Sequence, residues 1–305
     1  MKRYYSILVV ILALGSVSCS KMHNSFPRPV YSLETTTKMG GKIVKGTENY
    51  FGHIKSDTQK NLGSGVSLLD LSYLNMNGYA MQMYVYSVSL EQAQVLACTP
   101  DNGTALGKIQ KLSEQTNILN ESVTVLGAIN GDSYVASTMQ PTGILIKNGA
   151  SLKGTFSDAT GGYFAIMNDG TARLGTQDDF QTYKKSIKEA IGTKFPILED
   201  GFILQVSDTK AAARTAVAVS EDGMTVWFIV VDGVYFYYSN GITCEDLAKV
   251  MIACGASYGA VLQSGDQTTL VTRDEKSNPV MVVKNTPSSK GIEQNVVNGL
   301  AITQY

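Results

Sequence analysis

Histidine is nearly missing from this 305-residue sequence, which has only His23 and His53, both near the N-terminus. Imidazole is a common zinc ligand and the usual base of serine hydrolases, so its scarcity argues against both kinds of site. Segment 255–259 spells G-A-S-Y-G and fits a nucleophile elbow, but that motif needs a strand before a helix, and here the predicted order is reversed. No HExxH, GxxxxGK[ST], GxGxxG or paired CxxC motif occurs, so zinc proteolysis, P-loop chemistry and dinucleotide binding lack their signatures.

Cysteine is also scarce, and the four cysteines are Cys19, Cys98, Cys244 and Cys254. Four are too few for a disulfide framework in a chain of this length. Cys244 and Cys254 stand at the two ends of one predicted helix, roughly 15 Å apart, so they cannot bridge each other. Cys98 could pair with either, but we expect small buried thiols instead.

Neither sign of charge is in excess, because 25 Lys and Arg residues balance 26 Asp and Glu residues. A balanced chain creates no long-range field that would attract nucleic acid or anionic lipid. Nucleic acid is therefore not an expected partner.

The N-terminus has the three-part pattern of a secretory signal: a basic start, the apolar run 7–14, and small residues before Cys19. The apolar run is too short for a membrane-spanning helix. A cysteine between small residues and a polar stretch resembles a bacterial lipobox, so residues 1–18 are predicted to be removed and Cys19 to be lipidated. Ser16 stands where an aliphatic residue is usual, and cleavage to a free periplasmic protein is the alternative. We expect an extracytoplasmic protein that contacts a bacterial membrane through its lipid alone.

Residues 19–60 are polar and contain a Lys- and Gly-rich run, which is typical of a tether with little core of its own. Residues 61–305 are predicted to form one domain. Its first two apolar stretches, 67–74 and 79–88, flank Asn77-Gly78, the strongest short-range signal of a β-hairpin.

Strands outnumber helices in the rest of the chain. Apolar or alternating stretches predict strands over 122–129, 163–167, 171–175, 214–219, 224–231, 234–238 and 259–263. Helical spacing predicts helices over 106–119, over 178–192 with Gly192 as its left-handed cap, and from Thr243 to Gly255. The pattern predicts an α+β fold with a mixed, largely antiparallel sheet and three or four helices.

Short polar and glycine-bearing stretches follow or open many of these strands, where a rigid sheet can bring polar groups together on a ligand. The stretches are 128–134, 140–149, 213–219, 230–233, 239–248 and 261–269. Each one alone is more often turn chemistry. In this order and spacing, over residues 65–305, the set resembles the phosphodiester glycosidase family, whose animal member removes N-acetylglucosamine from phosphate-linked mannose.

The resemblance implies an α+β fold with a mixed sheet and assigns site residues one by one. The N-G-[DG] loop of the family matches Asn130, Gly131 and Asp132, and its P-x-G matches Pro141 and Gly143. Its R-T pair matches Arg214 and Thr215, and its D-G matches Asp232 and Gly233. Its S-x-G matches Ser239 and Gly241, and its helix-start glutamate matches Glu245. Arg214 would clamp a phosphate, because a guanidinium is a fixed fork of donors that stays charged; a structural salt bridge is the alternative. Glu245 is either a general base or a capping carboxylate.

The family's L-D-G-G-G-S-T-T loop is altered here. Gln263 replaces its aspartate and cannot ionise, and Ser264 and Asp266 flank Gly265 where the family has glycines. These side chains stand where the backbone of the family needs positive φ or close approach to a ligand. Asp266 could still supply a carboxylate to the same loop.

The expected function is hydrolysis of a glycosyl phosphodiester or related glycoside, with Asp132, Asp232, Glu245 and Asp266 as catalytic carboxylates and a carbohydrate or sugar phosphate as ligand. The alternative is a binding protein of the same fold that lost its chemistry with the altered loop. No cofactor is expected, although calcium held by Asp132, Asp232 or Asp266 is compatible with oxygen ligands.

Overall fold

The computed structural model describes residues 30–157, 159, 161–274 and 279–305. The predicted signal segment and Cys19 lie outside these residues. Ser32–Tyr305 form one compact unit. Within the part of the chain that is described, no helix has the length and apolar character needed to cross a membrane.

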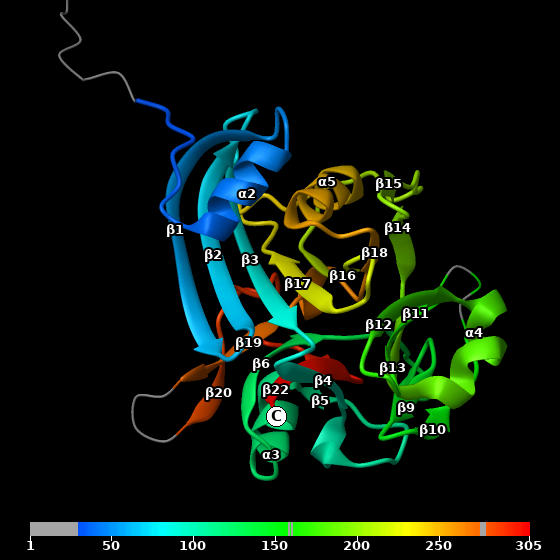
Figure 1. Ribbon diagram of the computed structural model, residues 1–305. Coiled ribbons are helices and arrows are strands. Elements are labelled where there is room, and N and C mark those ends of the chain that lie inside the picture. The colour runs from blue at the N-terminus through cyan, green and yellow to red at the C-terminus, as the bar shows by residue number, and fades with distance from the viewer. Residues whose placement is uncertain (1–29, 158, 160, 275–278) are drawn as a thin grey trace, which may run out of the picture. The chain divides into compact units, whose positions relative to one another are not determined.

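An antiparallel sheet of eight strands is the largest element of this unit (Figure 1). Its strands, in spatial order, are β1 (Phe51–Gly63), β2 (Val66–Asn75), β3 (Ala80–Ser89), β17 (Thr225–Val231), β16 (Arg214–Val219), β18 (Tyr258–Val261), β14 (Phe195–Glu199) and β15 (Phe202–Ile203). The hairpin of β2 and β3 turns at Asn77-Gly78 as predicted. Side chains alternate between the two faces of each strand, and in the central strands β3, β17 and β16 both faces are buried.

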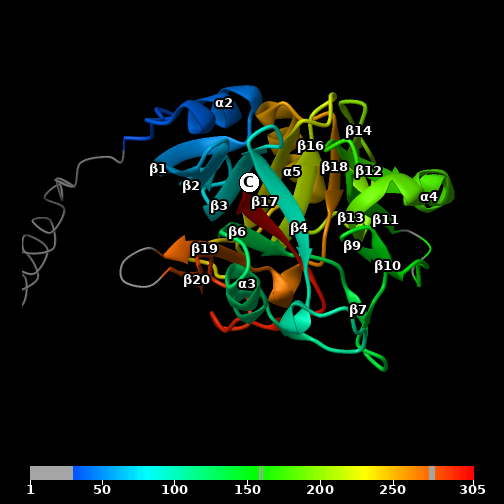
Figure 2. The same cartoon turned by 60° about the horizontal axis from the view of Figure 1, so that its bottom comes forward.

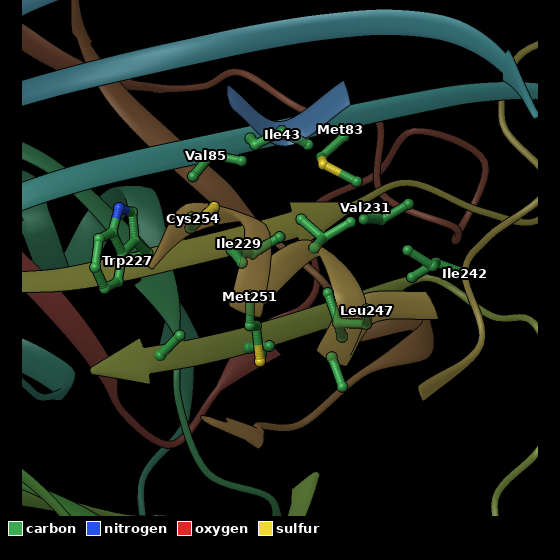
Figure 3. Packing of buried hydrophobic residues seen from close by; sticks show 14 of the residues in the cluster. Ile43, Met83, Val85, Trp227, Ile229, Val231, Ile242, Leu247, Met251 and Cys254 are labelled. Carbon is green, nitrogen blue, oxygen red and sulfur yellow. The ribbon is translucent and has the colours of Figure 1, made fainter. Parts of the chain in front are cut away.

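Helices α2 (Lys38–Gly46) and α5 (Cys244–Cys254) cover one face of this sheet. Figure 3 shows Ile43 of α2 and Leu247 and Met251 of α5 packed against Ile229 and other strand side chains. Helix α5 begins after the N-cap Thr243 and ends at Gly255, whose φ of 99° is left-handed, so the prediction for this helix is confirmed. Burying this apolar face contributes roughly 25 cal/mol per Å² removed from water.

Two five-stranded sheets lie against the other face (Figures 1 and 2). One contains β20 (Val280–Val283), β19 (Leu270–Asp274), β6 (Val125–Asn130), β22 (Gly299–Gln304) and β4 (Ala93–Cys98), with α3 (Leu112–Asn120) on its outer side. The other contains β10 (Ala150–Lys153), β9 (Leu145–Lys147), β13 (Ile187–Thr193), β11 (Gly162–Met167) and β12 (Ala172–Thr176), with α4 (Gln177–Tyr183) against it. Two short pairs complete the topology: β21 (Asn295–Val296) with β5 (Gln110–Lys111), and β7 (Tyr134–Val135) with β8 (Gln140–Pro141).

The α+β prediction is confirmed, as are buried thiols at Cys98, Cys244 and Cys254. The helix predicted over 178–192 is wrong beyond residue 183, because Ile187–Thr193 pair with β11 as strand β13. The strand predicted over 234–238 is also wrong, since these residues form a tight turn closed by Tyr235 and Ser239.

The tether predicted for residues 19–60 is wrong for residues 32–60, which belong to the folded unit. Strand β1 pairs along β2, and Ile43 and Val44 of α2 join the core. The carboxylate of Asp57 accepts hydrogen bonds from the backbone N–H and hydroxyl groups of Thr36 and Thr37, which fixes the start of α2. The polar composition of these residues does not indicate this role, because one apolar stripe along a short helix is enough to pack against the face of a sheet.

Candidate functional site

The polar stretches meet where several strands begin or end. Arg214, the first residue of β16, pairs with Val231, the last of β17, and Ala216 pairs with Val261 at the end of β18. Strand β6 ends at Asn130, beside the loop that leads into β19. The sheets therefore bring together residues up to 166 positions apart in the sequence.

Asn130 is the centre of this junction and is fully buried. Its amide oxygen accepts from the Thr215 hydroxyl at 2.6 Å and the Thr269 N–H at 2.9 Å, and its amide nitrogen donates to the Gln263 carbonyl at 2.6 Å. Three of the predicted site residues thus meet here. Through these bonds Asn130 holds strand β16 and the loop before β19 together.

Asp132 is buried at the end of the loop that follows β6. Its carboxylate accepts from the Thr142 hydroxyl at 2.7 Å and from the Gly143 N–H at 2.6 Å. Gly143 and Gly192 make this possible, since a Cβ on either would stand within 2.6 Å of the other's Cα. Burial raises the pKa of Asp132 to about 6, against the lowering effect of these donors and of nearby Lys153.

Asp232 is the second buried carboxylate, directly after β17. It accepts from Asn285 Nδ2 at 2.8 Å, from the Thr286 N–H at 2.9 Å and from the Tyr238 hydroxyl at 3.0 Å. Burial again raises its pKa to about 6, and the donors only partly compensate. A carboxylate held in this way loses its proton close to neutral pH, which is unusual for a structural aspartate.

Segment 263–270 links the two carboxylates. Gln263 N–H donates to the Gly131 carbonyl beside Asp132, while Asn285, the partner of Asp232, donates to the Thr268 carbonyl and accepts from the Leu270 N–H. One hydrogen-bonded network therefore runs from Asp132 through this loop to Asp232.

Two buried polar atoms in this network have no protein partner among the described residues: Nδ2 of Asn298 and Oγ1 of Thr268. Asn298 is fully buried, and its orientation is fixed because its Oδ1 accepts from the Asp132 N–H at 2.8 Å. An unsatisfied buried donor costs about 1–3 kcal/mol, so such groups mark places where a ligand or water supplies the partner.

Arg214 does not join this network, which corrects the predicted site around a central guanidinium. Successive side chains of a strand point to opposite faces, so Arg214 faces α5 while Thr215 faces Asn130. The guanidinium is buried, pairs with Asp208 at 2.7 Å and donates to the Lys210 carbonyl at 2.8 Å. The ion pair considered as the alternative is thus the arrangement that the structure contains.

The side chains of Glu245 and Asp266 are exposed, and no hydrogen bond among the described residues joins either carboxylate to the network. Glu245 pairs with Lys249 one turn along α5 at 2.8 Å, and this lysine lowers its pKa. Glu245 lines a cavity of about 740 Å³ beside the start of α5, together with Asp208. The structure therefore does not gather the four predicted carboxylates, and only Asp132 and Asp232 belong to one network.

The altered loop fits its backbone without strain. Ser264 is extended at φ −125°, and its hydroxyl donates to the Leu262 carbonyl at 3.0 Å. Gly265 alone takes a positive φ, of 75°. Neither Ser264 nor Asp266 has a positive φ, so the positive-φ requirement of the family does not apply at these positions in this chain. Close approach to a ligand stays a prediction.

The remaining predicted residues have structural contacts. The Ser239 hydroxyl donates to the Asp232 carbonyl at 2.5 Å, and Gly241 has a φ of 78° where a Cβ would collide with Ala212. Among the described residues, no group of three or more His, Cys, Asp or Glu side chains could hold a metal ion. The calcium site stays a prediction.

Sequence reasoning missed Thr142, Lys153, Tyr238, Asn285 and Asn298 as partners of the two carboxylates. Lys153 is buried and donates to the Gly143 carbonyl at 3.1 Å beside Asp132. Nothing local in the sequence indicates the contact of Asn298 with Asp132. Only the pairing of β22 with β6 creates it.

Comparison with known proteins identifies the family and the fold of this chain. The family model of phosphodiester glycosidases matches residues 124–303, which include both carboxylates. The fold resembles that of the zebrafish N-acetylglucosamine-1-phosphodiester alpha-N-acetylglucosaminidase catalytic domain, auto-inhibited by its pro-peptide, with a TM-score of 0.62, 17% identity, and coverage of 82% of this chain and 88% of that one.

A hypothetical protein from Synechocystis is similar at a TM-score of 0.58 and 10% identity, over 82% of this chain and 64% of its own. No curated protein matches the sequence significantly. At these identities the solved structures show the fold alone, whereas the family model covers more than half of the sequence. This chain belongs to the phosphodiester glycosidase family.

Proposed function

We propose that this protein hydrolyses a glycosyl phosphodiester or a related glycoside outside the cytoplasm, anchored to a bacterial membrane through a lipid on Cys19. The observation that carries the proposal is the network that holds Asp132 and Asp232, two buried carboxylates whose pKa values are raised to about 6. Raised pKa values of this kind cluster at functional sites. Family membership supplies the substrate class.

The chemistry needs only what these residues provide. Water attacks the anomeric carbon, the bond from that carbon to the phosphate oxygen breaks, and the electron pair leaves with the phosphate monoester. The attacking water gives its proton to an ionised carboxylate. With pKa values of about 6, Asp132 and Asp232 are mostly ionised at neutral pH. The second carboxylate stabilises the positive charge that develops on the sugar. A phosphate monoester is a stable anion and leaves without prior protonation.

Asn298 supports this assignment. Its fixed amide leaves Nδ2 as an available donor next to Asp132. We infer that it donates to an oxygen of the bound sugar or phosphate. Lys153 adds a buried positive charge on the same side, although its ammonium already donates to three carbonyl oxygens.

A second candidate function is binding of a glycan or sugar phosphate without turnover. Gln263, which stands in place of the family's aspartate, favours it, because its side-chain amide cannot ionise and donates only weakly to the neighbouring Ser264 carbonyl at 3.4 Å. In this candidate the network orients a ligand but does not activate water.

The direct test is release of sugar by the purified protein from a panel of sugar-phosphate diesters, including the methyl diester of N-acetylglucosamine 1-phosphate. The zebrafish relative serves as the positive control. Release above the uncatalysed rate supports hydrolysis, and no release from any substrate that the relative cleaves contradicts it.

The triple variant Gln263→Asp, Ser264→Gly, Asp266→Gly separates the two candidates. A gain of about 100-fold or more in hydrolysis would mark the natural chain as a binding protein, since this is the usual worth of an added acid–base group. Sugar release by the natural chain, together with an unchanged or lower rate in the triple variant, supports hydrolysis by the natural loop.

A further inference from the structure

The turn after Asp232 exposes four large apolar side chains within five consecutive positions. We name residues 234–238 the aromatic loop. Val234 is 65% exposed, Phe236 63%, Tyr237 90% and Tyr238 37%. Exposed apolar side chains scattered singly are ordinary, whereas a contiguous group indicates a binding surface.

The backbone of the aromatic loop is held firmly. Tyr235 N–H donates to the Ser239 carbonyl at 2.7 Å, and Ser239 N–H returns a bond to the Tyr235 carbonyl at 2.8 Å. The Tyr235 hydroxyl donates to the Pro287 carbonyl, and Asn240 Nδ2 donates to the Phe236 carbonyl at 2.9 Å. The exposed rings are therefore presented by an ordered turn, which reduces the entropy lost on binding.

The same turn is joined directly to the proposed site. The Tyr238 hydroxyl donates to Asp232 Oδ2 at 3.0 Å, and the Ser239 hydroxyl donates to the Asp232 carbonyl at 2.5 Å. Two hydrogen bonds therefore connect the aromatic loop with Asp232, so the exposed rings lie next to the proposed site.

The chemistry of the aromatic loop selects the kind of molecule. It carries no charged side chain, so it offers nothing to a phosphate. Phe236 and Tyr237 stand edge to face, with ring centroids 5.0 Å apart and planes at 82°. A sugar ring has an apolar face of C–H groups that packs on an aromatic ring, while its hydroxyls bond to polar tips such as a tyrosine hydroxyl.

We propose that the aromatic loop is a carbohydrate platform that holds a neutral sugar ring of the substrate next to the reacting bond. This inference rests on the proposed function, because the continuity with Asp232 is what favours a sugar over other apolar partners. It deepens that function by making the preferred substrate a glycan longer than one sugar unit.

The test measures binding separately from turnover. Full-length protein is run by affinity electrophoresis through gels that contain yeast mannan, glycol chitin or dextran, none of which needs to be hydrolysed. The variant Phe236→Ala, Tyr237→Ala removes both exposed rings but keeps the backbone bonds of the turn. Phe202→Ala is the matched control, because Phe202 is 75% exposed on β15. Thermal melting checks that both variants fold.

We expect at least one polysaccharide to retard the wild type and Phe202→Ala, with binding at least about fivefold weaker in the double variant, the worth of one aromatic contact. The platform would be overturned if the wild type bound none of the three polysaccharides, or if the double variant bound as tightly as the wild type. Ring-dependent sedimentation with vesicles of phosphatidylethanolamine and phosphatidylglycerol in place of glycan binding would overturn it too, in favour of a membrane contact. Glycan binding with no hydrolysis of any diester would leave the platform standing while the proposed function fails.

Discussion

The buried charges on the two faces of strand β16 differ in whether an opposite charge compensates them. Behind the strand, Arg214 is buried but neutralised by Asp208, with further bonds to backbone carbonyls. In front of it, past Thr215 and Asn130, two buried aspartates are held by neutral donors, with no cation bonded directly to either among the described residues. The pKa of Asp208 is lowered, with the Arg214 hydrogen bond as the largest cause, whereas the pKa values of Asp132 and Asp232 are raised by burial.

This difference separates charges that stabilise the folded state from charges that destabilise it. Two units of upward pKa shift in a carboxylate correspond to about 3 kcal/mol of lost stability at neutral pH. A fold retains such a group when it is needed for function, and substituting it tends to trade activity for stability. The comparison supports the proposal that the front face is the functional one, whereas the ion pair on the back face stabilises the fold.

The largest expected effect is that of Asp132→Asn on turnover. Loss of the ionisable group should lower kcat about 1,000-fold, within the range for acid–base residues. The fold should survive, because the new amide can accept from the Gly143 N–H and donate to the Thr142 hydroxyl, which in turn can donate to Ser133. Sugar release and urea denaturation measure the two quantities. Retained turnover would remove Asp132 from the chemistry.

Arg214→Met should show the opposite pattern. Arg214 is buried but Asp208 is one-third exposed, so removing the arginine should cost about 2 kcal/mol, and adding Asp208→Asn should recover part of it. Below the melting temperature, kcat and KM should stay within about twofold of the wild type. Were Arg214 the phosphate clamp first expected from the family, KM for phosphodiesters would instead rise by 10-fold or more.

The pH dependence of stability sharpens the comparison further. Asp132 has a raised pKa in the folded chain, so the stability that it contributes is present below about pH 4 and is lost as pH rises through about 6. Asp132→Asn should therefore match the wild type near pH 4 and exceed it by up to about 3 kcal/mol at pH 7, less any weakened hydrogen bond. Urea titrations at both pH values test this, and a stability difference independent of pH would contradict it.

Glu245→Gln should have the smallest effect. Its carboxylate is exposed and pairs with Lys249 within one turn of α5, an arrangement worth at most about 0.5 kcal/mol. We expect turnover within twofold of the wild type and no change in its pH profile. A 100-fold loss would place a catalytic base on the back face and break the comparison.

Much of the fold follows from local sequence. The conformations of the Asn-Gly turn at Asn77 and of the helix between Thr243 and Gly255 are determined by local residues, and the structure contains both as predicted. The conformation of residues 187–193 is not determined locally, because their apolar spacing suits a helix and only pairing with β11 makes them a strand. Residues 234–238 have strong β-propensity, but among the described residues their only β-bridge is the one that joins Tyr235 to Ser239 within the turn itself.

The site divides in the same way. The family resemblance predicted Asn130, Asp132, Thr215 and Asp232 as site residues, and all four join the hydrogen-bonded network because each lies within two residues of the end of a strand. It could not place Arg214, since the face to which a strand residue points depends on which register buries its neighbours. Nor could it find Asn298, whose contact with Asp132 is created by pairing across β6 and β22.

A crystal structure of the protein soaked with N-acetylglucosamine 1-phosphate tests the central claim most directly. We predict that the sugar phosphate lies on the front face, within hydrogen-bond distance of Asp132 or Asp232 and of Nδ2 of Asn298. The same ligand in the cavity beside α5, near Glu245 and the Arg214–Asp208 pair, would contradict it.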